Sequence, residues 1–238
     1  MKISWISFLW LIGLWSSAFG QNLQWKELQT PVKASLRGLS PVSDQICWAV
    51  GSQGIWLRTV DGGMTWDADV ISGMDSVDFR SIHAWDENSA IVASAGQPAV
   101  IYRTLDAGKT WELMGLEKTK NIHRILVDPT NPDVVYVGAI GNPFAAHAER
   151  GVYKTTDGGQ SWKLILHTND SSGVADMVLD PTNPNKLLVC MWQHIRTPWG
   201  FTSGGRGSGF YSTWDGGKNW KKLGKAEGLP DTTGRIGI

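Results

Sequence analysis

The stretch Thr155-Thr-Asp157-Gly-Gly159-Gln-Ser161-Trp162 decides the fold, because a unit of the same pattern occurs four times in the chain. The other three copies are Thr59–Trp66, Thr104–Trp111 and Thr213–Trp220. From Asp61 to Asp106, Asp157 and Asp215, the successive spacings are 45, 51 and 58 residues. This period is close to the length of one four-stranded blade of a β-propeller.

The chemistry of the unit predicts a hairpin turn held by an aromatic residue. The Asp carboxylate accepts hydrogen bonds from turn N–H groups, and the Gly two residues later adopts positive φ without steric cost. The Trp begins the return strand and packs against the sheet. This chemistry makes the repeated residues structural rather than catalytic: Asp61, Trp66, Asp106, Trp111, Asp157, Trp162, Asp215 and Trp220.

The repeat predicts an all-β fold, a β-propeller of four-stranded antiparallel blades. The expected blades cover about 30–70, 78–114, 121–166 and 173–223, and residues 233–238 resemble the start of a further blade. Trp25 resembles the Trp of an outer strand but no unit precedes it, so it predicts an orphan strand. About four blades plus an orphan strand indicate an incomplete ring within 21–238, with an exposed sheet edge.

Composition excludes several classes of protein. The 238 residues carry 22 Lys and Arg against 22 Asp and Glu, so the basic excess of a nucleic-acid binder is missing. Hydrophobic residues make up 42% and charged residues 18%, which argues against disorder. The content of 28 Gly and 14 Trp favours short strands and tight turns over helices.

The first twenty residues read as a signal peptide. Lys2 precedes the apolar run 3–15, and Ala18-Phe19-Gly20 offers a cleavage site before Gln21. We expect a secreted or periplasmic protein with no membrane span after cleavage; an uncleaved N-terminal anchor is the alternative. Cys47 and Cys190 lie in apolar runs and are interpreted as buried thiols, although an exported protein could pair them. No zinc-ligand spacing is present, so we expect no metal and no cofactor.

The repeated unit resembles the Asp box, or BNR repeat, of sialidases, sortilins and related β-propellers. The resemblance implies that each Asp box joins the third and fourth strands of a blade and is structural. Residues 25–111 resemble propellers of the photosystem II assembly/stability factor type. The residues that carry this likeness are Trp48–Gly54, Arg58-Thr59, Asp78–Arg80 and Ile101–Thr104.

Residues 111–238 resemble secreted bacterial proteins with a sortilin-like N-terminal propeller, which are often labelled glycosyl hydrolases. The residues that carry this second likeness are Glu149–Thr155, Met191–His194, Arg196, Pro198-Trp199 and the glycine-rich run Ser203–Gly209. The change of likeness falls at the second Asp box, and both a hybrid gene and a join of two genes fit it.

Two long loops of neighbouring blades form the first candidate ligand site, 141–150 and 193–208. Aromatic and basic side chains of this kind suit sugar stacking or peptide recognition. The predicted ligand-binding residues are Phe144, His147, Arg150, His194, Arg196, Trp199, Phe201 and Arg206. The alternative is that these loops pack on each other or cover a second domain.

A second candidate site is a set of basic residues on or near the innermost strands: Arg37, Arg80, Arg124 and Arg235. A channel lined by arginine favours carboxylates or acidic peptides. The alternative is that each guanidinium bonds to neighbouring carbonyls.

The favoured function is an exported binding or scaffold module for a peptide, protein or glycan, with no catalytic residue assigned. The alternative is a carbohydrate-active glycoside hydrolase of the sialidase or xyloglucanase type, which needs a carboxylate pair. Asp176 with Glu149 or Asp170 is the available pairing, but no spacing supports it. This hydrolase interpretation rests on family analogy.

Overall fold

The computed structural model describes residues 27–230 and 233–238, and this part of the chain forms four antiparallel sheets in chain order. The predicted signal peptide, its cleavage site and Trp25 lie outside the described residues. The first two sheets are β1 (Leu36–Pro41), β2 (Cys47–Gly51), β3 (Ile55–Thr59), β4 (Asp67–Val70), then β5 (Phe79–Ala84), β6 (Ala90–Ser94), β7 (Ile101–Thr104) and β8 (Glu112–Leu113).

The third and fourth sheets are longer. The third comprises β9 (Ile122–Asp128), β10 (Asn131–Ala139), β11 (Gly151–Thr155) and β12 (Lys163–Leu166). The fourth comprises β13 (Ser172–Asp180), β14 (Asn183–Thr197), β16 (Gly209–Thr213) and β17 (Lys221–Leu223), with β15 (Gly200–Ser203) pairing β14 beyond the sheet. Two short 3-10 helices, η1 (Glu117–Thr119) and η2 (Lys225–Glu227), complete the described structure. None of the described helices is long or apolar enough to cross a membrane.

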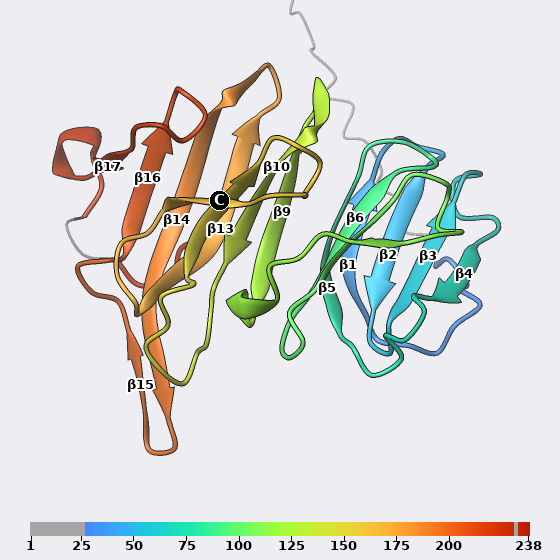
Figure 1. Cartoon of the computed structure of the whole chain (residues 1–238), viewed down its shortest axis with the longest axis horizontal. Helices are drawn as coiled ribbons and strands as arrows, with labels where there is room; N and C mark the ends of the chain where they lie inside the picture. Colours follow the sequence, from blue (N-terminus) through green and yellow to red (C-terminus); the bar gives the residue numbers. More distant parts are fainter. Residues whose placement is uncertain (1–26, 231–232) are drawn as a thin grey trace, which may run out of the picture.

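The sheets are the blades of a β-propeller, and their innermost strands touch in the order β1, β5, β9, β13. Figure 1 shows blades one and two on one side of the molecule and blades three and four on the other. A core of buried side chains fills each space between successive blades. The largest side chain with no exposed surface is Trp48, in the core between blades one and two. The predicted all-β propeller of four-stranded antiparallel blades is confirmed.

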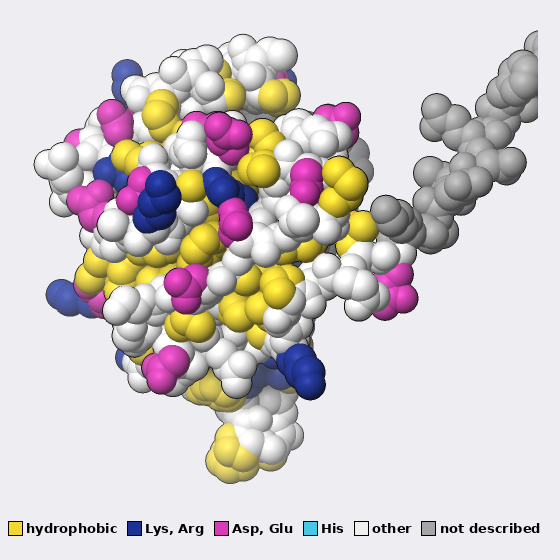
Figure 2. All heavy atoms as spheres, turned by 90° about the vertical axis from the view of Figure 1, so that its right-hand side faces the viewer, with side chains coloured by type: hydrophobic (Ala, Val, Ile, Leu, Met, Phe, Trp, Pro, Cys, Tyr) yellow, Lys and Arg dark blue, Asp and Glu magenta, His cyan; other side chains and the backbone are white. Residues whose placement is uncertain are grey.

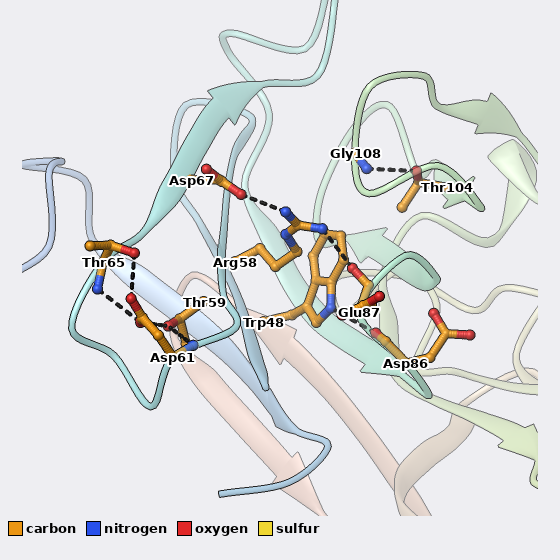
Figure 3. Close-up of polar contacts among 10 residues, drawn as sticks. All are labelled: Trp48, Arg58, Thr59, Asp61, Thr65, Asp67, Asp86, Glu87, Thr104 and Gly108. Atoms are coloured by element: carbon orange, nitrogen blue, oxygen red, sulfur yellow. Dashed lines mark hydrogen bonds and ion pairs between the residues drawn. The ribbon is translucent and has the colours of Figure 1, made fainter. Parts of the chain in front are cut away.

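In each blade, an Asp box closes the hairpin between the third and fourth strands through one repeated set of hydrogen bonds. Figure 3 shows this set for the first copy. Asp61 accepts from the Thr65 backbone N–H at 2.9 Å and from the Thr65 hydroxyl at 2.6 Å. Thr59 donates to Asp61 at 2.8 Å and accepts from the Gly63 N–H at 2.9 Å. These bonds, led by that of the Thr65 hydroxyl, lower the pKa of Asp61 to about 2.

The second Asp box differs from the first at one residue, where alanine stands in place of glycine. Gly62 has φ of 70° in the first box, whereas Ala107 takes the same place in the second with φ of 66°. A residue with a Cβ is strained in this left-handed region. The Asp106 hydrogen bonds are nevertheless the same as those of Asp61, at 2.9 and 2.6 Å from Thr110.

Hydrogen bonds across the blade interfaces hold successive blades together. The indole of Trp48 donates to the Asp86 carbonyl at 3.1 Å, and Arg58 donates to the Glu87 carbonyl at 2.8 Å (Figure 3). The Asp-box indole of Trp162 reaches back to the carbonyl of Met114 at 2.7 Å. Trp220 does the same with the Ile165 carbonyl at 2.8 Å, so the third and fourth Asp boxes serve the inter-blade joint as well as their own turns.

The segment Thr233–Ile238, which in sequence resembles the start of a further innermost strand, has no strand assigned to it. No strand within 27–230 pairs with this segment, so the start of a further blade stays a prediction. It lies instead against blade four, where Ile236 packs on Ala175 and Cys190. The N–H of Ile238 donates to the Asp176 carboxylate at 3.1 Å.

Candidate functional site

The two long loops of blades three and four lie against each other. The N–H of Arg196 donates to the Pro143 carbonyl at 2.7 Å, and the N–H of His147 ties the first loop to the connection between β12 and β13 through the Asp170 carbonyl at 2.8 Å. The bases of the two loops therefore pack on each other, which was the alternative to a ligand site.

Arg150 holds this contact together from inside the protein. Its side chain has 0% exposure. The guanidinium donates to the carbonyls of Ser171 at 2.8 Å and His194 at 3.3 Å, and also to those of Asn142 and Ala145. Burial lowers the pKa of Arg150. This residue, predicted to bind ligand, lies beneath the surface and positions the two loops.

The segment 193–208 is not wholly a loop, because β14 continues past the sheet and pairs with β15 as a hairpin. Its base is an aromatic stack: the rings of Trp192 and His194 are 4.0 Å apart and 13° from parallel. Phe201 meets the Trp192 ring edge-on at 5.7 Å, and the Trp192 indole donates to the Ser203 hydroxyl at 3.0 Å. Such cross-strand pairs stabilise the hairpin.

A cavity of about 260 Å³ opens at the base of this hairpin. It brings together two predicted sets, because Arg80 and Arg235 from the inner-strand set line it beside His194 and Arg196 from the loop set. Sequence reasoning missed Asn121, His123 and Trp192, which complete the polar and aromatic wall. Asn121 and His123 lie at the start of β9. In the sequence, only an alignment of the innermost strands of successive blades could have pointed to them.

The charge of the cavity comes from its three arginines. Burial lowers the pKa of His194 to about 4. Burial, followed by the nearby Arg235 and Arg124, also lowers the pKa of His123. Both imidazoles are therefore neutral at pH 7, and no Asp or Glu is found among the described lining residues. The cavity is a cationic site with hydrogen-bonding and aromatic walls, which suits carboxylates.

The inner-strand arginines do not form a continuous ring. Arg37 and Arg80 share Asp78, at 3.8 and 3.2 Å. Arg124 pairs with Asp176 across the blade interface at 2.6 Å and is not in the cavity lining. These partners are carboxylates, not the backbone carbonyls of the alternative expectation. Arg235 extends instead over the ring of Trp192, at 5.5 Å.

The remaining predicted ligand-binding residues lie outside this cavity. Phe144, 69% exposed, lines a separate cavity of about 350 Å³ with Lys120. Trp199 and Arg206 are exposed. Burial lowers the pKa of His147, and the charge of Glu149, which acts in the opposite direction, does not outweigh it.

The carboxylates considered for a hydrolase each have a partner in the fold. Asp176 is bound by Arg124 and by the Ile238 N–H; burial raises its pKa, but these hydrogen bonds outweigh burial and lower it overall. Glu149 accepts from the Tyr153 hydroxyl at 2.9 Å, and Asp170 lies 3.3 Å from His167. Within the described ranges, no group of three or more His, Cys, Asp or Glu is placed to hold a metal ion.

A larger cavity, about 640 Å³, lies on the outer part of blade four and is lined by none of the predicted ligand-binding residues. Its lining includes Val178, Leu188, Leu223 and Trp214. At the joint between blades three and four, the corresponding residue of β12, Ile165, packs beneath Gly217 of the next Asp box. The cavity thus corresponds to an inter-blade surface that no described blade covers, and its lining also includes the charged residues Asp180, Lys186 and Lys221.

Comparisons with known proteins agree with this propeller architecture. The family model described as Photosynthesis system II assembly factor YCF48 matches residues 18–178, and so continues past the second Asp box. The photosystem II assembly lipoprotein Ycf48 of Synechococcus sp. (strain CC9902) is 27% identical over 201 residues, covering 83% of this chain and 52% of that protein. The chain thus spans about half the length of this curated relative.

Two solved structures share the fold at low identity. YCF48 bound to D1 peptide has a TM-score of 0.51 and 14% identity, covering 85% of both chains. The GH74 enzyme of Niastella koreensis has a TM-score of 0.60 and 17% identity, covering 79% of this chain and 30% of the enzyme. Because the family model covers more than half of the sequence, the chain belongs to the Photosynthesis system II assembly factor YCF48 family.

Proposed function

We propose that this chain is an exported binding module that holds an acidic segment of a protein partner at the arginine-lined cavity. The observation that carries the proposal is the convergence of Arg196 and Arg235 on one cavity whose described lining has no carboxylate, beside Arg80, which is paired with Asp78 at 3.2 Å. Guanidinium groups bind carboxylates through paired, charge-assisted hydrogen bonds. The adjoining Trp192 ring and the Asn121 amide supply apolar and polar contacts for the rest of a peptide.

Family membership supports a peptide over other carboxylates. One related structure is YCF48 bound to D1 peptide, and the curated relative is named an assembly lipoprotein. Export follows from the predicted signal peptide at 1–20. A folded module outside the cytoplasm that binds a peptide segment would serve the assembly of a larger complex.

The test uses fluorescence anisotropy with two ten-residue probes: a labelled peptide of alternating Asp, Glu and Ser, and its Asn/Gln counterpart. The D1 peptide is assayed in parallel. We expect saturable binding of the acidic probe that weakens as salt rises, and roughly tenfold weaker binding for each of Arg196→Ala and Arg235→Ala. Arg206→Ala is the matched control, because Arg206 is exposed and outside the cavity lining.

Equal binding of the acidic and amide probes would contradict the proposal. So would affinity that is unchanged in the cavity variants, or an absence of binding by any of the three peptides. Circular dichroism of each variant separates loss of the site from loss of the fold.

A further inference from the structure

The hairpin formed by β14 and β15 projects well beyond the body of the protein (Figure 1). Its strands pair from His194 with Ser203 to Thr197 with Gly200, which leaves Pro198-Trp199 as a two-residue tip. Trp199 is 88% exposed and Phe201 is 49% exposed. Figure 2 shows hydrophobic side chains at the lower end of this projection.

Three contacts hold the hairpin that carries the tip. The Thr197 hydroxyl donates to the Gly200 carbonyl at 3.2 Å across the turn. The Arg196 guanidinium lies over the Phe201 ring at 4.9 Å, and the base of the hairpin is fixed by the Arg196–Pro143 backbone bond at 2.7 Å. Because the hairpin is already formed, little conformational entropy is lost when Trp199 binds.

The exposure of Trp199 differs from that of Trp214, the other exposed tryptophan among the described residues. Trp214 is 67% exposed, and the Lys186 ammonium covers its ring at 4.4 Å. Within the described part of the chain, no ring or cation contact is made by Trp199. An uncovered indole on a projecting hairpin is an unfavourable surface in water unless something binds it.

The charge and the shape of the hairpin together indicate what binds its tip. Residues 193–209 contain Arg196 and Arg206 and no Asp or Glu, so the hairpin and its flanks favour an anionic surface. A stable protein interface buries about 800 Å² on each partner, which a convex tip of two residues does not supply. Shallow insertion of one or two aromatic side chains suits a lipid interface, where Trp places its ring at headgroup level.

We propose that the tip Pro198–Phe201 inserts into the interfacial layer of an anionic lipid surface. This lipid contact goes beyond the proposed peptide site: Trp199 is not part of the cavity lining, whereas Arg196 lies both in that lining and on the hairpin.

The test is sedimentation with vesicles of phosphatidylcholine alone and of phosphatidylcholine with one quarter phosphatidylglycerol. The chain is used from Gln21, which retains every described residue and removes the apolar run 3–15 from the assay. We expect binding to the anionic vesicles, little binding to the neutral ones, and roughly tenfold weaker partition for Trp199→Ala. Trp214→Ala is the matched control, which removes an exposed indole elsewhere and keeps wild-type partition.

Two results would overturn the proposal: no sedimentation of the wild-type chain with anionic vesicles, or equal partition of Trp199→Ala and wild type. If Trp199→Ala weakens peptide binding while the wild type ignores vesicles, the tip belongs to a protein-binding surface instead. The acidic-peptide assay is a separate measurement, so failure of the lipid contact and failure of the peptide site are distinguishable.

Discussion

Replacing Arg150 with methionine will lower the stability of the protein and loosen the two loops that frame the cavity. Methionine keeps most of the side-chain length and apolar stem but removes the guanidinium. The carbonyls of Asn142, Ala145, Ser171 and His194 then lose their buried donor.

The magnitude follows from two opposing contributions. A hydrogen bond to a charged group contributes about 1.5–3 kcal/mol, and leaving a buried acceptor unpaired carries a further cost. Against this, burial of the Arg150 charge is itself unfavourable, as its lowered pKa indicates, and methionine removes that cost. We expect a net loss of about 3 kcal/mol in the free energy of unfolding, equivalent to a melting temperature roughly 6–12 °C lower.

The assay is equilibrium unfolding in urea, followed by circular dichroism, with Arg206→Met as the control. Arg206 is exposed, so its replacement should change the free energy of unfolding by no more than about 0.5 kcal/mol. If Arg150→Met unfolds at the same urea concentration as wild type, the assignment of Arg150 as the residue that fixes both loops is refuted.

Three further predictions concern strain, protonation and thiol reactivity. Ala107→Gly relieves the positive φ of 66° and should raise the free energy of unfolding by about 0.5–1 kcal/mol in urea melts, whereas Gly62→Ala should lower it. The pKa of His194 in the folded protein is about 4, below its ordinary value of 6.5. The contribution of His194 to stability is therefore complete above pH 6.5 and is lost as the pH falls towards 4. His194→Gln should flatten the pH dependence of the melting temperature between these two pH values. Burial raises the pKa of Cys190 to about 12, so iodoacetamide at pH 8 should leave it unmodified until the protein is unfolded, while half-buried Cys47 reacts slowly; rapid labelling of Cys190 in the native protein would contradict its burial.

The Asp boxes were predictable from sequence because their chemistry is local. Asp61 bonds to groups within four residues, and the same spacing recurs at each copy. The strands between boxes follow from alternating apolar residues that fill the inter-blade cores. Fold class could therefore be predicted from one repeated turn and its period.

The site was harder to predict because its residues meet across blades. Asn121 and His123 come from the start of β9, whereas Arg80 lies in β5 and Arg235 in the segment beyond blade four. No spacing along the chain encodes that meeting point.

Arg150 illustrates a second limit of sequence reasoning. An arginine in a long loop has the same local pattern whether it faces a ligand or caps backbone carbonyls, and only the packing of a neighbouring blade decides between them. The hairpin at 193–208 was missed for a similar reason: its glycines indicate a loop, but the stack of Trp192, His194 and Phe201 pairs the strands.

Hydrogen–deuterium exchange with and without the acidic peptide tests the central claim most directly, that the arginine-lined cavity is the binding site. Peptide should slow exchange in three segments that meet at the cavity: the start of β9, the base of the β14–β15 hairpin and residues 233–238. Protection confined to the outer part of blade four, around Leu188 and Leu223 at the larger apolar cavity, would contradict it.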